Sequence, residues 1–480
     1  MKHPAPFRSP PPVELRPLWL WLVGIAMVVA CAAAAPGDGA LERGERIMAK
    51  GSVEGPLEDW MMRAQELRGL RFVRAVEMRP LIRSEIAQTI REEIEEMLPP
   101  GEVEAYRDAY VALGALPPGL DLVATFSSIY GSQMVGRYSR REGALYLLES
   151  ESPGGYSRET VAVHELVHAL QDQHFSSAMA LSEELRHNDD LVSALAGVIE
   201  GDATFTMLGA EDSDPTTERS VEAAEAFRDG MLQELSAGFG PLGEAPLLIQ
   251  ISVIFPYAFG TVLAAHRYVD DGNAGIDDLL TEAPLSTLEL LNTQPGERRP
   301  DEVEFVRLPL DALAERVAGK SCKVGHHNVA GSLTMRVLLQ QYRASNPRSL
   351  EQRWRGDRFV HVECSTGPEL VWLTRWADDA AARDFASAYR TIAPSIAKQS
   401  ELAGIPRAQQ SGRVVLVTTP GMREHSQLIL ESSEIRAYRS FERWYRDGCF
   451  GEGQGCPAGT ELPLRGSRHL DSLRKIVANR

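Results

Sequence analysis

The spacing of hydrophobic residues predicts that residues 41–117 are mostly helical. Within residues 85–97 the apolar positions recur in helical steps, at Ile86, Ile90, Ile94 and Met97. An amphipathic helix produces this spacing, and Pro99-Pro100 would end it. We expect this helical region to be either a plain packing layer or a pro-segment that covers a cleft.

Between residues 132 and 149 the pattern changes to that of strands. Gln133–Tyr138 and Ala144–Leu148 are separated by a short loop that ends in a glycine, which is typical of a β-hairpin. Long apolar segments that predict helices lie at 158–175, 191–208 and 245–270.

Helix and strand patterns alternate beyond a boundary at Pro295–Pro300. Helices are expected at 335–342 and 380–389, and strands at 359–363 and 413–418. This alternation predicts a smaller α+β domain. His326 and His327 also lie here, and we expect them in a solvated loop because adjacent side chains point apart.

Composition and charge narrow the functional class. The chain has 480 residues, of which 44% are hydrophobic and 24% charged, as in globular proteins. Its formal net charge of −17 argues against a nucleic-acid partner, because the phosphates would be repelled.

The first 35 residues have the form of an export signal, with a basic stretch followed by the apolar run Leu18–Ala35. Cys31 follows Val28-Val29-Ala30, which resembles a lipobox. We therefore expect residues 1–30 to be a signal peptide and a lipid on Cys31 to attach the protein to a membrane. The alternatives are ordinary cleavage after Ala32–Ala35 and a retained membrane anchor. We expect an exported protein, either a cell-envelope lipoprotein or a secreted protein.

Four cysteines remain beyond Cys31, and this even number predicts two disulfides in an exported protein. Cys449 and Cys456 flank a flexible loop and could close a short ring. By elimination, Cys322 would pair with Cys364. A zinc site made from these four residues is the weaker alternative, since no Cys-x₂-Cys pair occurs.

The segment 158–175 contains the motif His164-Glu165-Leu166-Val167-His168. On a helix, positions i and i+4 lie on one face, so His164 and His168 can bind one metal ion. Catalytic zinc takes three protein ligands and leaves a position for water. The motif places Glu165 beside that water as the general base. The alternative is an ordinary half-buried helix with two incidental histidines.

Two residues are candidates for the third ligand. His174 follows His168 by six residues, but the arrangement that uses this spacing needs a glycine where this chain has Gln171, a good helix former. In a continuous helix His174 would point about 240° away from His168. Glu200 lies in the apolar segment 191–208, where an unpaired charge is costly to bury. We expect Glu200 to bind the metal; the alternative is a carboxylate that reaches solvent or an arginine.

These segments resemble a family of bacterial exported zinc-metallopeptidase-like proteins with the gluzincin plan, in which HExxH lies on one helix and a glutamate on the next. The resemblance is carried by Leu166–Phe175 and Ile199–Thr204. It extends to Val135–Tyr138, Leu145–Leu147, Phe255–Gly260 and Pro284–Thr287, and it covers roughly residues 65–310.

The resemblance implies an α+β fold with a zincin-like, predominantly helical metallopeptidase core at residues 121–300. A helical N-terminal region at 31–120 would precede this core, and the α+β domain at 301–480 would follow it. The hairpin strand ahead of the metal helix would form the edge of a cleft where an extended peptide can pair. The alternative is an ordinary hairpin packed on the helix.

A hydrolase of this type needs a donor for the oxyanion that develops on the scissile carbonyl. Tyr257 and His266 are candidates, and the resemblance favours Tyr257; either could instead be a core residue. The sequence departs from the family at Asn292, where relatives carry histidine, and at Gly272-Asn273, where they carry glycine and tryptophan. These departures point to an altered substrate site.

We therefore expect an exported zinc metallopeptidase that acts on a peptide or protein substrate. Zn²⁺ would be bound by His164, His168 and Glu200, with Glu165 and Tyr257 as catalytic residues. The alternative is a zinc-stabilised protein with a non-catalytic binding or envelope-structural role. The intact Glu165 argues against this alternative, since a structural site has no use for a base.

Overall fold

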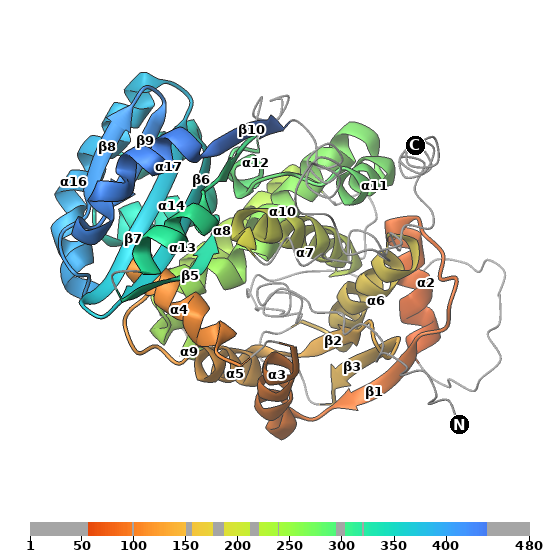
Figure 1. Ribbon diagram of the computed structural model, residues 1–480. Helices are drawn as coiled ribbons and strands as arrows, with labels where there is room; N and C mark the ends of the chain where they lie inside the picture. The colour runs from red at the N-terminus through yellow and green to blue at the C-terminus, as the bar shows by residue number, and fades with distance from the viewer. Residues whose placement is uncertain are drawn as a thin grey trace, which may run out of the picture.

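Figure 1 shows the computed structural model of the chain, which describes residues 56–97, 100–149, 156–175, 187–211, 220–238, 240–293, 303–318 and 321–438. The expected signal peptide, Cys31, the boundary at 295–300, and Cys449 with Cys456 lie outside the described residues. The structure is mixed α+β, as the sequence predicts. Helices and a small sheet form one side of the molecule, and a larger sheet with its own helices forms the other (Figure 1).

The N-terminal region is helical, with one strand that the sequence pattern missed. Its helices are α2 (Leu57–Arg68), α3 (Arg83–Met97), α4 (Glu102–Leu113) and α5 (Leu122–Gln133). Ile86, Ile90 and Ile94 of α3 are buried, as their spacing predicts. Strand β1 (Glu77–Leu81) pairs in parallel with β3 (Ala144–Leu148). Because this partner is far away in sequence, the local pattern gives little sign of the strand.

The expected hairpin is present and belongs to a three-stranded sheet. Strand β2 (Gly136–Ser139) pairs antiparallel with β3, and β1 pairs with the other side of β3, so the order is β1-β3-β2. Among the described strands, β2 therefore lies at an edge. The expected start of the first strand is wrong, because Gln133 is the last residue of α5 and extended backbone begins at Met134.

Three long apolar helices form the centre of the molecule (Figure 1). They are α6 (Arg158–His174), α7 (Asp189–Glu211) and α10 (Leu247–Asp271), each close to its predicted range. By length and composition α7 and α10 could cross a membrane, but 89% and 78% of their apolar windows are buried inside the molecule. They are therefore packed as core helices. Shorter helices lie near them: α8 (Val221–Ala237), α9 (Gly240–Glu244), α11 (Asn273–Thr281) and α12 (Thr287–Leu291).

The C-terminal part contains a five-stranded antiparallel sheet in the order β5-β6-β7-β9-β8. Its strands are β5 (Cys322–Asn328), β6 (Trp354–Cys364), β7 (Gly367–Trp376), β8 (Arg407–Ser411) and β9 (Val414–Thr418). Trp372 of β7 packs against α16 (Asp379–Gln399). Its neighbours Val371 and Leu373 cluster instead with residues of α13 (Leu310–Ala318) and α17 (Ser426–Ser432). Helices therefore pack on both faces of this sheet.

The C-terminal part contains further elements. They are strand β4 (Val303–Arg307), which pairs with β10 (Glu434–Tyr438), the helices α14 (Gly331–Gln341) and α15 (Pro347–Arg353), and the 3₁₀-helix η2 (Pro420–His425). The helices and strands expected at 335–342, 380–389, 359–363 and 413–418 correspond to α14, α16, β6 and β9.

Cys322 and Cys364 form a disulfide that joins β5 to β6, the pairing expected by elimination. The expectation of a solvated loop at His326 and His327 is wrong. Both residues belong to β5, and His326 is only 8% exposed. The physical reason is that β5 completes the sheet by pairing with β6, so the sheet and its covering helices bury residues that no local pattern marks as a strand.

One hydrophobic cluster extends through all three regions expected from the sequence. It includes Leu57 of α2, Leu166 of α6 and Trp372 of β7. Described residues on both sides of positions 120 and 300 share this cluster, and the domain boundaries at those positions stay predictions.

Candidate metal centre

Helix α6 presents the two histidines of the motif on one face. Its first turn is capped by Ser157, whose side chain accepts a hydrogen bond from the Thr160 N–H. The helix continues through Gln171 to His174. Nε2 of His164 and Nε2 of His168 are 3.2 Å apart, as expected for imidazoles one turn apart that point the same way.

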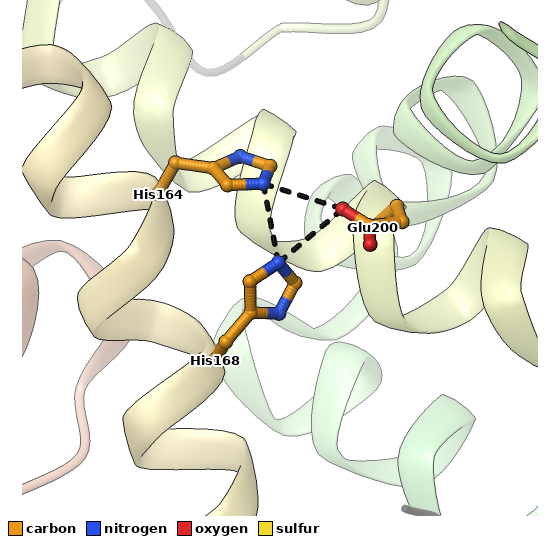
Figure 2. A group of neighbouring side chains, drawn as sticks. All are labelled: His164, His168 and Glu200. Atoms are coloured by element: carbon orange, nitrogen blue, oxygen red, sulfur yellow. Dashed lines mark hydrogen bonds and ion pairs between the residues drawn. The ribbon is translucent and has the colours of Figure 1, made fainter. Parts of the chain in front are cut away.

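Glu200 of α7 faces these histidines across the gap between two helices (Figure 2). Its Oε2 lies 3.2 Å from Nε2 of His164 and 3.3 Å from Nε2 of His168. The three side chains are buried, with His168 the most exposed at 6%. In the described part of the chain, they are the one group of histidine, cysteine and carboxylate residues close enough together to bind a metal ion.

Glycines set the depth at which α7 packs, and therefore the position of Glu200. Gly197 and Gly201 lie on one face of α7, one on each side of Glu200 in sequence, and they meet Gly260 of α10. A Cβ atom on Gly260 would lie 1.9 Å from the Gly197 carbonyl oxygen, and one on Gly201 would lie 2.3 Å from that of Gly260. The two backbones are therefore in contact, which only glycine permits at these positions.

The three ligand atoms fit a tetrahedral metal site. Zinc binds histidine nitrogen and carboxylate oxygen at about 2.0–2.2 Å, and tetrahedral ligands at such distances are about 3.3–3.5 Å apart. The observed separations of 3.2, 3.2 and 3.3 Å are close to this value. Two imidazoles and one carboxylate are also the donor types of a known class of catalytic zinc sites, which leave the fourth position for water.

The pKa values of the three side chains indicate that the buried carboxylate of Glu200 needs a positive charge beside it. Burial alone would lower the pKa of His168, but the negative charge of Glu200 raises it to about 9. Burial alone would raise the pKa of Glu200, but His168 and His164 lower it to about 2. Burial lowers the pKa of His164. Without a metal, a proton on His168 therefore supplies the cation that the buried carboxylate needs, and a metal ion would replace it.

Glu165 lies beside His168 and Glu200 and is completely buried. Its Oε2 accepts a hydrogen bond of 2.8 Å from the backbone N–H of Tyr138 in the edge strand β2. Within the described residues its other oxygen, Oε1, has no hydrogen-bond partner. Burial raises the pKa of Glu165 to about 8. A carboxylate with one anchored and one uncommitted oxygen is suited to accept and release a proton.

The structure brings one of the two candidate oxyanion donors to this group. Tyr257 of α10 is buried, and its ring stacks on His164 with the centroids 6.2 Å apart. His266 lies farther along α10, where burial lowers its pKa and its charged neighbours are Glu225, Asp270 and Glu222. His174 is not part of the group, because its Nε2 lies 2.7 Å from the Arg71 carbonyl oxygen.

Two features near the group escaped the sequence analysis. Tyr130 of α5 is buried, and burial together with the charge of Glu200 raises its pKa. Gln171, considered above only as a helix former, bonds to His168. Neither residue belongs to the HExxH motif, and each is an ordinary choice for a helix, so the sequence carries no signal for these contacts. Asn292 is the C-cap of α12.

Comparison with known proteins matches one segment of the chain. Residues 316–427 match a domain of unknown function, DUF8575. This segment runs from the end of α13 through the five-stranded sheet and does not include His164, His168 or Glu200. No curated protein and no solved structure matches the chain.

Proposed function

We propose that this protein is a zinc-dependent hydrolase that cleaves peptide bonds, with a peptide or protein as substrate. His164, His168 and Glu200 bind the zinc, and Glu165 is the general base. The observation that carries the proposal is the convergence of three buried ligand atoms at tetrahedral spacing, with a further buried carboxylate beside them. A zinc ion held there by three protein ligands would lower the pKa of its water from 15.7 to about 7 and polarise a carbonyl group.

Glu165 takes the proton of the attacking water and passes it to the leaving amine. The N–H of Tyr138 holds Oε2 of this carboxylate, so the proton moves through Oε1. The raised pKa of about 8 describes the site without a metal. A dication bound by His164, His168 and Glu200 would favour the ionised form of Glu165 and so lower its pKa toward the working pH.

The zincin-like arrangement of the core is part of the same proposal. Strand β2 lies at a sheet edge among the described strands. The backbone N–H of Tyr138 in this strand donates a hydrogen bond to Glu165. An extended peptide that pairs with β2 would therefore run past the base. Tyr257, next to His164, is the proposed donor to the oxyanion.

A second candidate function is a zinc-stabilised protein that does not turn over substrate. The burial of the group favours it, since Glu165 is 0% exposed and Glu200 1%. The three-ligand set argues for the enzyme, because structural zinc sites are almost always closed by four protein ligands.

The test combines metal analysis with a cleavage assay on the full-length chain. The wild type should contain close to one zinc per chain; Glu200→Ala should lose it and His174→Ala should keep it. Glu165→Gln should keep the zinc and the melting temperature, while cleavage of a diverse peptide library falls by about 10²–10⁴-fold. Equal rates for wild type and Glu165→Gln would refute the catalytic role, and cleavage by neither would favour the zinc-stabilised protein.

We also propose that the protein is exported, as a lipoprotein or a secreted protein. The disulfide between Cys322 and Cys364 supports this proposal, because disulfides persist mainly in oxidising compartments.

A further inference from the structure

The ring nitrogen of His168 that faces away from Glu200 has a defined partner. Nδ1 of His168 lies 2.9 Å from Oε1 of Gln171, one turn further along α6. An amide oxygen only accepts hydrogen bonds, so Nδ1 carries the proton. The lone pair of the neutral ring is then on Nε2, which points at His164 and Glu200.

The orientation of the Gln171 amide is fixed from its other end. Its Nε2 donates to the Ile199 carbonyl oxygen and to Oδ2 of Asp202, both at 2.9 Å. Both partners are acceptors, so a flipped amide would place an oxygen against two oxygens. Gln171 is completely buried, and water cannot replace these bonds.

Asp202 is bound in turn by Arg68, a residue of the N-terminal region. Oδ1 of Asp202 forms an ion pair of 2.7 Å with Nε of Arg68, at the end of α2. Nη2 of Arg68 bonds in turn to Asp277 of α11 at 2.6 Å. The side chains of Arg68 and Asp202 are both 0% exposed. These contacts form a chain that starts at His168 and runs through Gln171 of α6 and Asp202 of α7 to Arg68 of α2.

We propose that Gln171, Asp202 and Arg68 position His168 for metal binding, so that α2 is a permanent part of the metal centre and not a removable pro-segment. The inference rests on the proposed function for the identity of the metal. Gln171 selects the tautomer and the ring angle of His168, Asp202 orients Gln171, and Arg68 holds Asp202. Removal of α2 would leave two buried or half-buried carboxylates without their cation, which is strongly destabilising.

The two ligand histidines differ in this respect. Nδ1 of His164 has no hydrogen-bond partner among the described residues. The positioning chain therefore acts on one imidazole only, and a change at Gln171 should affect metal binding through His168 alone.

Zinc affinity is the decisive measurement, obtained by competition with a chromogenic chelator on the full-length chain. Gln171→Met removes the acceptor and keeps a similar shape, and we expect it to weaken zinc binding about 10–100-fold. The visible spectrum of the Co²⁺-substituted protein should shift as the ring angle changes. If Gln171→Met does not fold, Gln171→Asn takes its place. The asparagine keeps the amide but is too short to reach His168, and we expect the same loss of zinc affinity.

Gln173→Met is the matched control. Gln173 lies on the same helix and bonds to the backbone of Val73 and Arg74 in the same N-terminal region, without a contact to His168. We expect its zinc affinity and Co²⁺ spectrum to equal those of the wild type. An effect as large as that of Gln171→Met would show that any loosening of this region weakens the site, and would overturn the proposal.

The role of Arg68 is tested by a double-mutant cycle with Arg68→Lys. If Arg68 acts through Gln171, its substitution should weaken zinc binding in the wild type but have no further effect in Gln171→Met. Additive effects would overturn the link to α2. Unchanged affinity in Gln171→Met would refute the positioning chain alone, whereas a wild type that binds no zinc would refute the proposed function and this inference together.

Discussion

Gly260→Ala tests whether the contact between α7 and α10 sets the position of Glu200. The new Cβ atom would lie 1.9 Å from the Gly197 carbonyl oxygen, and real Cβ atoms essentially never come closer than 3.0 Å. The two backbones must therefore separate by about 1.1 Å. Neither atom is on a flexible side chain, so the helices themselves have to move.

The expected loss of stability follows from the cost of overpacking, and the expected loss of zinc affinity follows from the geometry of metal binding. Overpacking a close contact costs about 1–3 kcal/mol, and the better helix propensity of alanine returns about 1 kcal/mol. The balance is a fall of about 1 kcal/mol in the free energy of unfolding. Metal–ligand distances tolerate changes of about 0.2 Å, so a movement of α7 by about 1 Å would take Glu200 out of range. Zinc affinity should fall by at least the 10–100-fold that is typical of a disturbed outer shell.

The assay measures urea unfolding of the metal-free protein and zinc affinity by chelator competition. Val269→Ala is the control, since it is also a change to alanine on α10 but at a side chain that is 64% exposed. It should change neither quantity. Wild-type stability and zinc affinity in Gly260→Ala would refute the reasoning, because the helices would then tolerate a methyl group at their contact.

Three further predictions concern stability. Ser157→Ala removes the cap of α6, so urea unfolding should show a loss of about 1 kcal/mol; an unchanged midpoint would contradict this. Replacement of Cys322 and Cys364 by alanine opens a loop with a sequence separation of 42 and should cost about 2–4 kcal/mol by the same assay. Burial and the charge of Arg358, whose Nη2 lies 2.7 Å from Nδ1 of His327, lower the pKa of His327 to about 2. This histidine stays neutral in the fold while the unfolded chain takes up a proton below about pH 6.5, so stability is lost as the pH falls. Below about pH 5.5, where the unfolded histidine is almost fully protonated, the wild type should lose about 1.4 kcal/mol more per pH unit than His327→Gln; parallel curves would disprove this.

Local periodicity was enough to predict the long apolar helices α6, α7 and α10 and the hairpin of β2 and β3. Segments such as 158–175 and 245–270 have long apolar faces, and tertiary packing rarely overrides such a pattern. It missed several strands, and β1 and β5 show the reason. Both are strands through pairing with distant segments, β1 with β3 and β5 with β6. His326 is buried and His327 half-buried for the same reason, although their own sequence resembles a loop.

The sequence by itself determined the part of the candidate metal centre that one helix contains. The i, i+4 spacing of His164 and His168 fixes their shared face wherever the helix lies, and Glu165 follows from the same spacing. The sequence also proposed Glu200, from the cost of burying a carboxylate. Only the tertiary structure decided that Glu200 reaches the two imidazoles, because its position depends on the contact of glycines in α7 and α10. The same holds for Gln171 and Arg68: their side chains have many available partners, and only the packing of α2, α6 and α7 selects His168 and Asp202 among them.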